Sequence, residues 1–138
     1  MQNEMKNSEC IFYLLNKTAR SASKYWQTQV KDLNLTATQA KVLAFMQDLD
    51  NPTSQQLADH CALDNATLTG VIDRLLKLKL VERQPSDSDR RVLHINYKQP
   101  GRQLAEQLQS RQLPANEEFL SALTDAEQQQ LRHLLKKL

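Results

Sequence analysis

The recurrence of helix-start signals along the chain constrains the fold more than any other feature. Three threonines are followed three positions later by a glutamine or glutamate, the spacing of a capping box, in which the two side chains satisfy free amides at a helix start. The pairs are Thr36 with Gln39, Thr53 with Gln56, and Thr124 with Glu127. Asp64 precedes another amphipathic segment as a further expected N-cap. Only 2 glycines and 4 prolines interrupt the chain, so these signals predict a mainly α-helical protein.

Length and composition restrict the class of protein. The 138 residues suffice for one domain with a real core, and 40% apolar with 25% charged residues is typical of globular proteins. No segment approaches the ~20 apolar residues of a membrane-spanning helix, and the N-terminal "MQNEMKNSE" lacks the apolar core of a secretion signal. With 2 cysteines, no disulfide framework is expected. We therefore expect a cytoplasmic protein with no membrane partner.

The segments between the caps predict the remaining elements. The stretch "SECIFYLLNKTARSASKYWQTQVKDL" has helical apolar spacing and predicts one long helix that begins at Asn7 or Ser8. The stretches "LVER" and "RVLHINY" predict a β-hairpin with "QPSDSDR" as its exposed tip. On the buried face of the second strand we expect its alternate apolar side chains, those of Leu93, Ile95 and Tyr97. The stretch "PGRQLAEQLQSRQL" then predicts a helix that ends or bends at Pro114.

A short helix, a turn, a second helix and a hairpin follow one another as in a winged helix-turn-helix. The stretch "SQQLADHCALDNATLTGVIDRLLKLKLVERQPSDSDRRVLHI" contains L-A, a short turn, T-L-T, D-R-L and then D-x-D-R-R. In this pattern the chain resembles the MarR family of transcriptional regulators. The resemblance implies a mainly α fold with a small β-hairpin wing in a single domain, 1–138. It places the winged helix-turn-helix core at 36–100 and dimerisation helices at 8–33 and 101–138. Lys98 and Pro100 depart from the family's pattern and leave the start of the next helix open.

The helix after Asp64 has two unlike faces. One is an apolar stripe at helical spacing, formed by Leu68, Val71, Ile72, Leu75 and Leu76. The other is small or polar, and its Gly70 costs about 1 kcal/mol relative to alanine inside a helix. A helix that enters the major groove of DNA benefits from such a face; alternatively, Gly70 eases packing against a neighbouring element. The candidate DNA-contacting residues on this helix are Asn65, Ala66, Thr67, Thr69, Gly70 and Arg74.

The expected hairpin tip lies in the most basic part of the chain. From Val71 to Arg102 there are eight basic and four acidic residues, although the net charge of the whole chain is only +2. A local basic patch is typical of proteins that bind polyanions. The resemblance implies that a wing arginine, first Arg91 and second Arg90, enters the minor groove and that Asp89 helps to hold it. The narrow, strongly negative minor groove favours arginine. The alternative is a tip that is charged only for solubility.

Other chemistries find little support in the sequence. Cys61 is expected to be a small buried residue, and so is Cys10, although one branch of the resembling family has a peroxide-sensing cysteine in the first helix. The 3 histidines lie apart, and no Cys-x-x-Cys or His-x-x-x-His pair predicts a metal site. Neither a nucleophile motif nor a glycine-rich phosphate loop occurs. We therefore expect neither enzymatic activity nor a cofactor.

The terminal segments contain more apolar residues than a winged-helix core of this size needs. They are Ile11, Phe12, Leu14, Leu15, Phe119, Leu120, Leu123, Leu131, Leu134 and Leu138. In the resembling family the terminal helices interdigitate in a two-fold dimer, which implies a homodimer on a palindromic site in double-stranded DNA. The alternative is a monomer whose terminal helices cover its own core.

The resemblance also implies a repressor that leaves DNA when a small aromatic or phenolic effector binds. Residues that could line the effector crevice are Tyr13, Arg20, Trp26 and Lys41. Two other functions remain open at this point. A winged-helix protein-interaction module would not bind DNA, and its outer helix face should be apolar. A thiol-based oxidant sensor would depend on Cys10.

Overall fold

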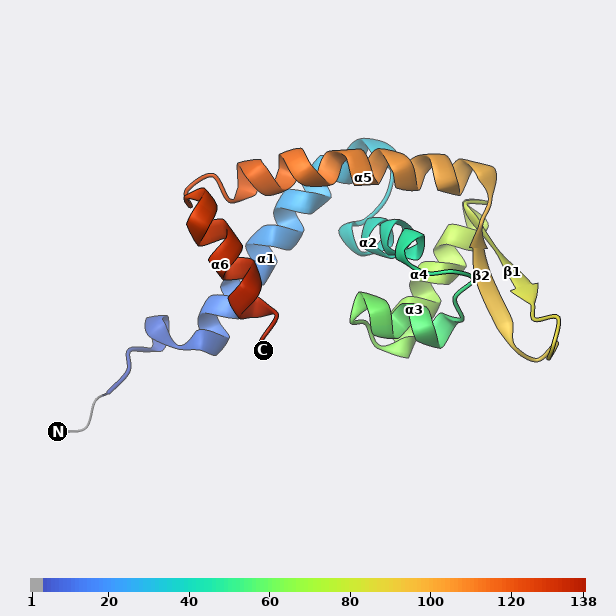
Figure 1. Cartoon of the computed structure of the whole chain (residues 1–138), viewed down its shortest axis with the longest axis horizontal. Coiled ribbons are helices and arrows are strands. Elements are labelled where there is room, and N and C mark those ends of the chain that lie inside the picture. The colour runs from blue at the N-terminus through green and yellow to red at the C-terminus, as the bar shows by residue number, and fades with distance from the viewer. Residues whose placement is uncertain (1–3) are drawn as a thin grey trace. The chain divides into compact units, whose positions relative to one another are not determined.

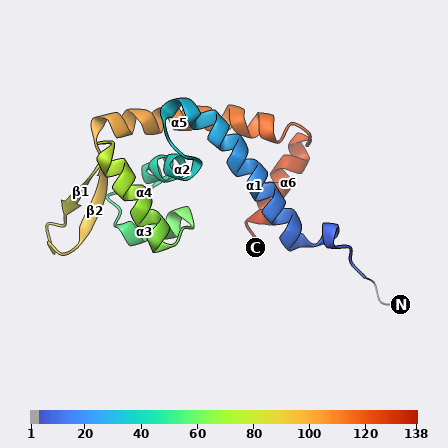
Figure 2. The same cartoon turned by 180° about the vertical axis from the view of Figure 1, so that it is seen from behind.

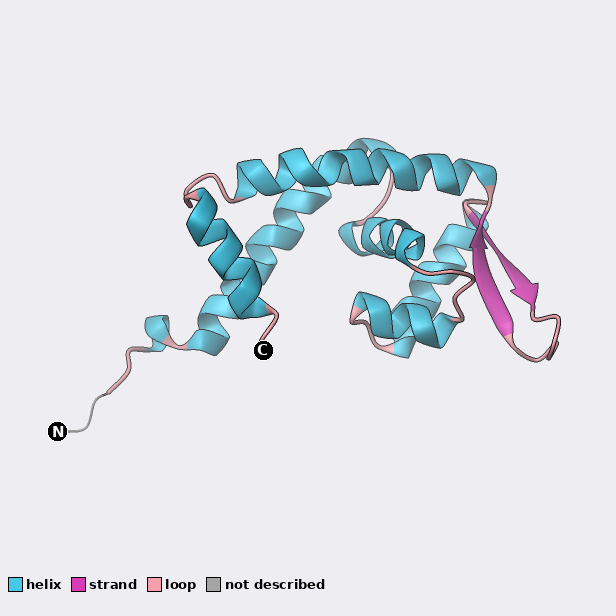
Figure 3. Ribbon diagram, in the orientation of Figure 1, coloured by secondary structure: helices cyan, strands magenta, loops and turns pink. Residues whose placement is uncertain are grey.

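The computed structural model describes residues 4–138. The first three residues of "MQNEMKNSE", the segment in which no secretion signal is expected, lie outside the described residues. The described chain is helical apart from one two-stranded antiparallel sheet (Figures 1 and 3). It divides into two compact units, Val30–Ser110 and a second unit of residues 4–29 with 111–138. Within residues 4–138, no helix is both long enough and apolar enough to cross a membrane.

The unit Val30–Ser110 contains the expected helix-turn-helix. After a 3₁₀ turn at Lys31–Leu33 come α2 (Ala37–Phe45), a 3₁₀ turn at Met46–Asp48, α3 (Ser54–Cys61) and α4 (Asn65–Lys77). The predicted caps are confirmed, because Thr36 accepts from the amide of Gln39 at 3.1 Å and Thr53 from that of Gln56 at 3.2 Å. Asp64 caps α4 as expected. The turn before α4 is closed by Ala62 in the left-handed conformation, with φ of 54°.

Three helices of this unit bury one apolar core. The apolar stripe of α4 is confirmed, with Leu68, Ile72 and Leu75 at most 1% exposed, whereas Leu76 is only partly buried. The stripe packs on α2 and α3, which contribute Leu43 and Leu57. Burial of each such side chain stabilises the fold by roughly 1.5–3 kcal/mol. The rigid core fixes the direction in which the opposite face of α4 points.

The predicted hairpin is present as β1 (Val81–Pro85) and β2 (Leu93–Tyr97), drawn magenta in Figure 3. The first strand ends two residues later than expected and the second begins two residues later, so the tip lies at residues 86–92 instead of 84–90. Ile95 is buried, but Leu93 is 43% exposed, which corrects its expected place in the core. Leu93 pairs with Pro85 in the last pair of the ladder before the tip. The amide of Ile95 donates to the carbonyl of Pro52 at 2.8 Å and ties the hairpin to the start of α3.

Helix α5 (Gln99–Phe119) begins directly after the hairpin, and Pro100 lies in its first turn, where proline is tolerated. Gly101 lies against the backbone of Leu80, at the end of the connection between α4 and β1. A Cβ at this position would lie 1.9 Å from the carbonyl oxygen of Leu80, so only glycine fits. Of the two predictions for Pro114, an end of the helix is wrong, because α5 continues for five residues beyond it, and a bend there stays a prediction. The buried Ala115 follows the proline directly, so packing stabilises the continuation.

The second unit consists of α1 (Ile11–Val30), the end of α5 and α6 (Asp125–Leu135). The long first helix is confirmed, but its start is not. Asn7 and Ser8 lie in a separate 3₁₀ turn, and the carbonyl of Cys10 accepts the first bond of α1. Tyr25 donates a hydrogen bond of 2.6 Å to Glu118 and links α1 to α5. Helix α6 starts at the predicted Thr124 cap.

Candidate nucleic-acid interface

The N-terminus of α4 is held by its cap. Asp64 accepts from the Thr67 amide at 2.7 Å and from the Thr67 hydroxyl at 2.9 Å. These bonds, the amide bond first, lower the pKa of the Asp64 carboxyl below its ordinary value. The Thr69 hydroxyl donates to the carbonyl of Asn65 at 2.8 Å. Both threonine hydroxyls therefore use their hydrogens within the helix and have free lone pairs for an external donor.

The outer face of α4 is open to solvent. Figure 2 shows this helix from the side opposite to Figure 1. All the candidate contact residues on it are exposed: Asn65, Ala66, Thr67, Thr69, Gly70 and Arg74. A Cβ built at Gly70 meets no heavy atom of the described residues within 4 Å. Gly70 thus does not ease packing against another element of the chain. The face is small and polar, not apolar as a protein-interaction module would require.

The hairpin tip holds Arg91 in a defined position. Its backbone amide and its Nε donate to one oxygen of Asp89 at 3.0 and 3.1 Å, and its guanidinium donates to the other at 3.2 Å. The Arg91 side chain, and then its amide, lower the pKa of the Asp89 carboxyl. The Arg91 side chain is nevertheless 91% exposed. Arg90 is exposed beside it. The tip therefore presents a preoriented guanidinium to solvent, and the expected role of Asp89 in holding it matches this geometry.

Arg83 is a candidate that the sequence analysis missed. Its guanidinium forms an ion pair of 3.1 Å with Asp73, which links β1 to the exposed side of α4. The pair connects the helix face to the wing, so Arg83 is a candidate for a contact with a phosphate. The two residues are ten positions apart and in different elements, so no local periodicity indicated the contact.

The cysteines differ in their surroundings. Cys61 is 2% exposed, as predicted, and burial raises the pKa of its thiol. Cys10 is only partly buried, so the prediction of a buried structural thiol is wrong for it. It lies between the 3₁₀ turn and the first turn of α1. Within residues 4–138, no three His, Cys, Asp or Glu side chains lie close enough together to hold a metal ion.

The four residues predicted to line an effector crevice lie in three places. Trp26 lines an apolar cavity of about 600 Å³ between α1, α5 and α6 of the second unit. Tyr13 and Arg20 lie together along a shallow groove on α1. Lys41 belongs to α2 in the other unit and is partly buried. No pocket within either unit is lined by all four.

Comparisons with known proteins assign the chain to a family. The MarR family model matches residues 35–93. The multiple antibiotic resistance protein MarR of Salmonella typhimurium is 31% identical over 130 residues, which cover 93% of this chain and 88% of that protein. The chain belongs to the MarR family.

Two further proteins extend this assignment over nearly the whole chain. The HTH-type transcriptional repressor NicR of Pseudomonas putida is 26% identical over 131 residues, which cover 95% of this chain and 83% of NicR. The structure of Bordetella bronchiseptica BpsR, whose DNA binding is regulated by 6-hydroxynicotinic acid, superposes with a TM-score of 0.90. It is 27% identical and covers 98% of this chain and 96% of that one. Like these MarR-type regulators, the protein is a DNA-binding regulator of transcription.

Proposed function

We propose that this MarR-family protein is a homodimeric repressor that binds a palindromic operator and is released by a small aromatic effector. The observation that supports it best is the exposed face of α4 around Gly70, which no part of the described chain covers, and the preoriented Arg91 of the hairpin tip adds to it. Residues 36–100 form the DNA-binding core, and residues 8–33 and 101–138 form the dimerisation helices. Because its ligand is chromosomal DNA, we place the protein in the cytoplasm.

In this proposal α4 enters the major groove with its N-terminal residues at the base edges. Ala66 and Gly70 permit close approach. Thr67 and Thr69 accept hydrogen bonds from the amino groups of adenine or cytosine, because their own hydrogens are donated within the helix. Asn65 and Arg74 contact base edges or phosphates. Arg91, with Arg90 second, enters the flanking minor groove.

The homodimer is supported by apolar surface on the second unit. Large apolar side chains of α1 are exposed, among them Phe12 at 74% and Ile11 at 52%. Leu134, Leu135 and Leu138 of the C-terminal segment are also exposed, at 47 to 89%. A monomer rarely exposes so many adjacent apolar side chains. A two-fold dimer would bury them and place two copies of α4 about 34 Å apart, one turn of duplex DNA.

Repression and an aromatic effector are inferred from the relatives. NicR is a repressor, and 6-hydroxynicotinic acid regulates the DNA binding of BpsR. In this chain the apolar cavity beside Trp26, the groove with Tyr13 and Arg20, and Lys41 are the candidate contacts. An aromatic ring would lie against apolar side chains, and a cationic residue would pair with a carboxylate.

Selection of bound duplexes from a random library by the purified protein tests the proposal. We expect enrichment of an inverted repeat with half-sites about 10 base pairs apart and two chains per duplex by sedimentation. Enrichment of an asymmetric site bound by one chain would contradict the dimer. Absence of any enriched sequence would contradict operator binding.

A further inference from the structure

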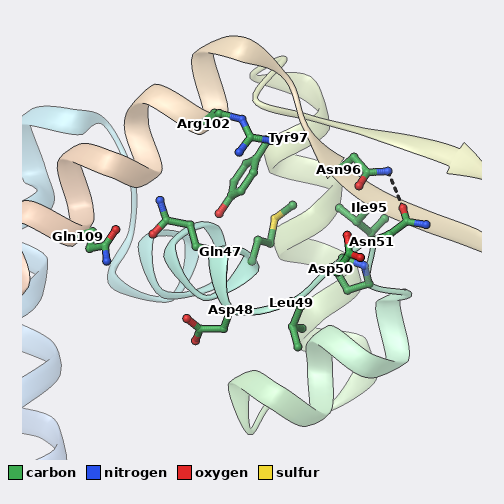
Figure 4. A pocket seen from close by; sticks show the side chains of 12 residues that line it. Gln47, Asp48, Leu49, Asp50, Asn51, Ile95, Asn96, Tyr97, Arg102 and Gln109 are labelled. Atoms are coloured by element: carbon green, nitrogen blue, oxygen red, sulfur yellow. Dashed lines mark hydrogen bonds between the residues drawn. The ribbon is translucent and has the colours of Figure 1, made fainter.

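A polar cavity of about 510 Å³ lies within the unit Val30–Ser110, and Figure 4 shows its side chains. Its walls come from the 3₁₀ turn Met46–Asp48, the loop that follows, β2 and the first half of α5. None of the residues proposed above for DNA or effector binding lines it. The volume falls within the range of about 300–1,000 Å³ typical of small-molecule sites.

One side of this cavity presents a cation on a fixed support. The guanidinium of Arg102 lies 5.3 Å from the centroid of the Tyr97 ring, an attractive cation–π geometry. The Tyr97 hydroxyl donates to the carbonyl of Leu43, so the ring itself is held in place. Among residues 4–138, no carboxylate forms an ion pair with Arg102. Arg102 is thus oriented without being neutralised.

Two carboxylates also line the cavity, that of Asp48 at the end of the 3₁₀ turn and that of Asp50 in the loop that follows, and Figure 4 shows them apart from each other. Asp48 is 2.8 Å from Nε2 of His60, and Asp50 forms no ion pair within the described chain. Both Arg102 and Asp48 affect the pKa of the Tyr97 hydroxyl. Burial raises its pKa most, while Arg102 opposes and Asp48 adds to the rise. Charges of opposite sign therefore face the same phenol.

Neutral amides complete the walls. Gln47 and Gln109 both line the cavity, and the amide of Asn96 donates to that of Asn51 at 3.0 Å along one edge (Figure 4). These groups can donate and accept hydrogen bonds without adding charge. A purely anionic ligand would be repelled by the two aspartates, and a purely cationic ligand by Arg102.

We propose that this cavity binds a small zwitterion of the amino-acid class, with the ligand's carboxylate at Arg102 and its ammonium at Asp50, the carboxylate that forms no ion pair. Because the two charges stand on opposite sides, an ω-amino acid, whose charges are separated by several carbons, fits better than a ligand with adjacent charges. The site is independent of the DNA-binding proposal, so its test needs no DNA.

Titration of the ¹⁵N-labelled full chain with 4-aminobutyrate, followed by NMR, tests the site. We expect saturable shifts of backbone amides in residues 47–51 and 95–97. Butyrate and butylamine, which each carry one of the two charges, should bind about ten-fold more weakly, since each lacks one charge-assisted interaction. Equal affinity for all three compounds, or no saturable shift, would overturn the proposal.

Substitutions distinguish the site for the ligand's carboxylate from the site for its ammonium. Arg102→Gln and Asp50→Asn should each weaken 4-aminobutyrate binding about ten-fold. Arg102→Gln should leave butylamine binding no weaker, and Asp50→Asn should leave butyrate binding no weaker. Glu106→Gln, an exposed change on α5 outside the cavity, is the matched control and should bind as the parent does. Parental affinity in both cavity variants, with parental unfolding temperatures, would show that the cavity is not the site.

Discussion

Under the proposed function, folding and DNA binding make opposite demands on Gly70. Gly70→Ala should raise the free energy of unfolding by about 0.5–1 kcal/mol, because alanine is favoured inside a helix and its methyl group meets nothing in the chain. The same methyl group should weaken operator binding if α4 lies deep in the major groove. Chemical denaturation and fluorescence anisotropy measure the two effects. A variant that is more stable and binds the operator as well as the parent would refute the placement of this face in the groove.

A substitution of Arg91 tests the proposed role of the wing in DNA binding. Arg91→Ala should weaken operator binding and reduce the slope of log affinity against log salt by about one unit, since one phosphate-region cation is lost. The loss should be largest with A·T-rich flanks, where the minor groove is narrow. Ser86→Ala, an uncharged change at the same tip, is the control. Anisotropy over a salt series would detect the difference, and parental binding at every salt concentration would leave the tip with only a solubilising role.

Cys10 tests the oxidant-sensing alternative. The thiol is only partly buried, and the other cysteine, Cys61, is buried in the core of the unit Val30–Ser110. We expect Cys10→Ser to leave the response of operator binding to peroxide unchanged. Electrophoretic mobility shifts with and without peroxide provide the measurement. The regulator would be a thiol sensor if peroxide released the parent from DNA but not the variant.

Helices α1 and α5 are joined by the hydrogen bond from Tyr25 to Glu118. This bond, followed by burial and the negative charge of Glu118, raises the pKa of Tyr25 from 10.0 to about 12. The raised value means that the neutral phenol is favoured in the folded state. Its stabilising contribution is therefore complete below pH 10 and is lost as the pH rises towards 12.

Glu118→Gln should return the pKa of Tyr25 towards 10.0, because the amide has no charge to disfavour the phenolate. NMR of ¹³Cζ-labelled tyrosine across this pH range, with Tyr25→Phe to assign the signal, measures the shift. Glu117→Gln is a neighbouring control on the exposed part of α5. An unchanged titration of Tyr25 in Glu118→Gln would show that burial alone sets its pKa.

Local signals predicted some element boundaries well and others poorly. Capping boxes place the starts of α2, α3 and α6 correctly because the cap acts within four residues. The start of α1 was mispredicted, and of the two alternatives at Pro114 the end of the helix was wrong. Cys10 is extended and separates the 3₁₀ turn from α1, and packing of the buried Ala115 stabilises α5 beyond the proline. Leu93 was expected in the core but is exposed. Strand alternation predicts which face of the sheet a residue lies on, but it does not predict how far along that face the core extends.

The assembled molecule should depend on its last helix. Removing residues from Thr124 onward deletes α6, with the exposed Leu134 and Leu135, and uncovers the apolar cavity next to Trp26. If these surfaces form the dimer, the truncated chain should become monomeric or aggregate, because an obligate interface resembles a bisected core. Sedimentation velocity gives the answer. An intact, soluble dimer of the truncated chain would place the interface elsewhere.

The amino-acid sequence by itself determined the order of the helices, the hairpin between α4 and α5, and the membership in the MarR family, because caps, periodicity and a contiguous motif are local in the chain. It also indicated Arg91 and the small face of α4. Only the tertiary structure decided that Gly70 faces open space, that Asp73 pairs with Arg83, and that Arg102 and Asp50 line one cavity. Each of these observations depends on which residues, distant in sequence, come into contact when the core packs. The spacing of side chains along one segment does not predict those contacts.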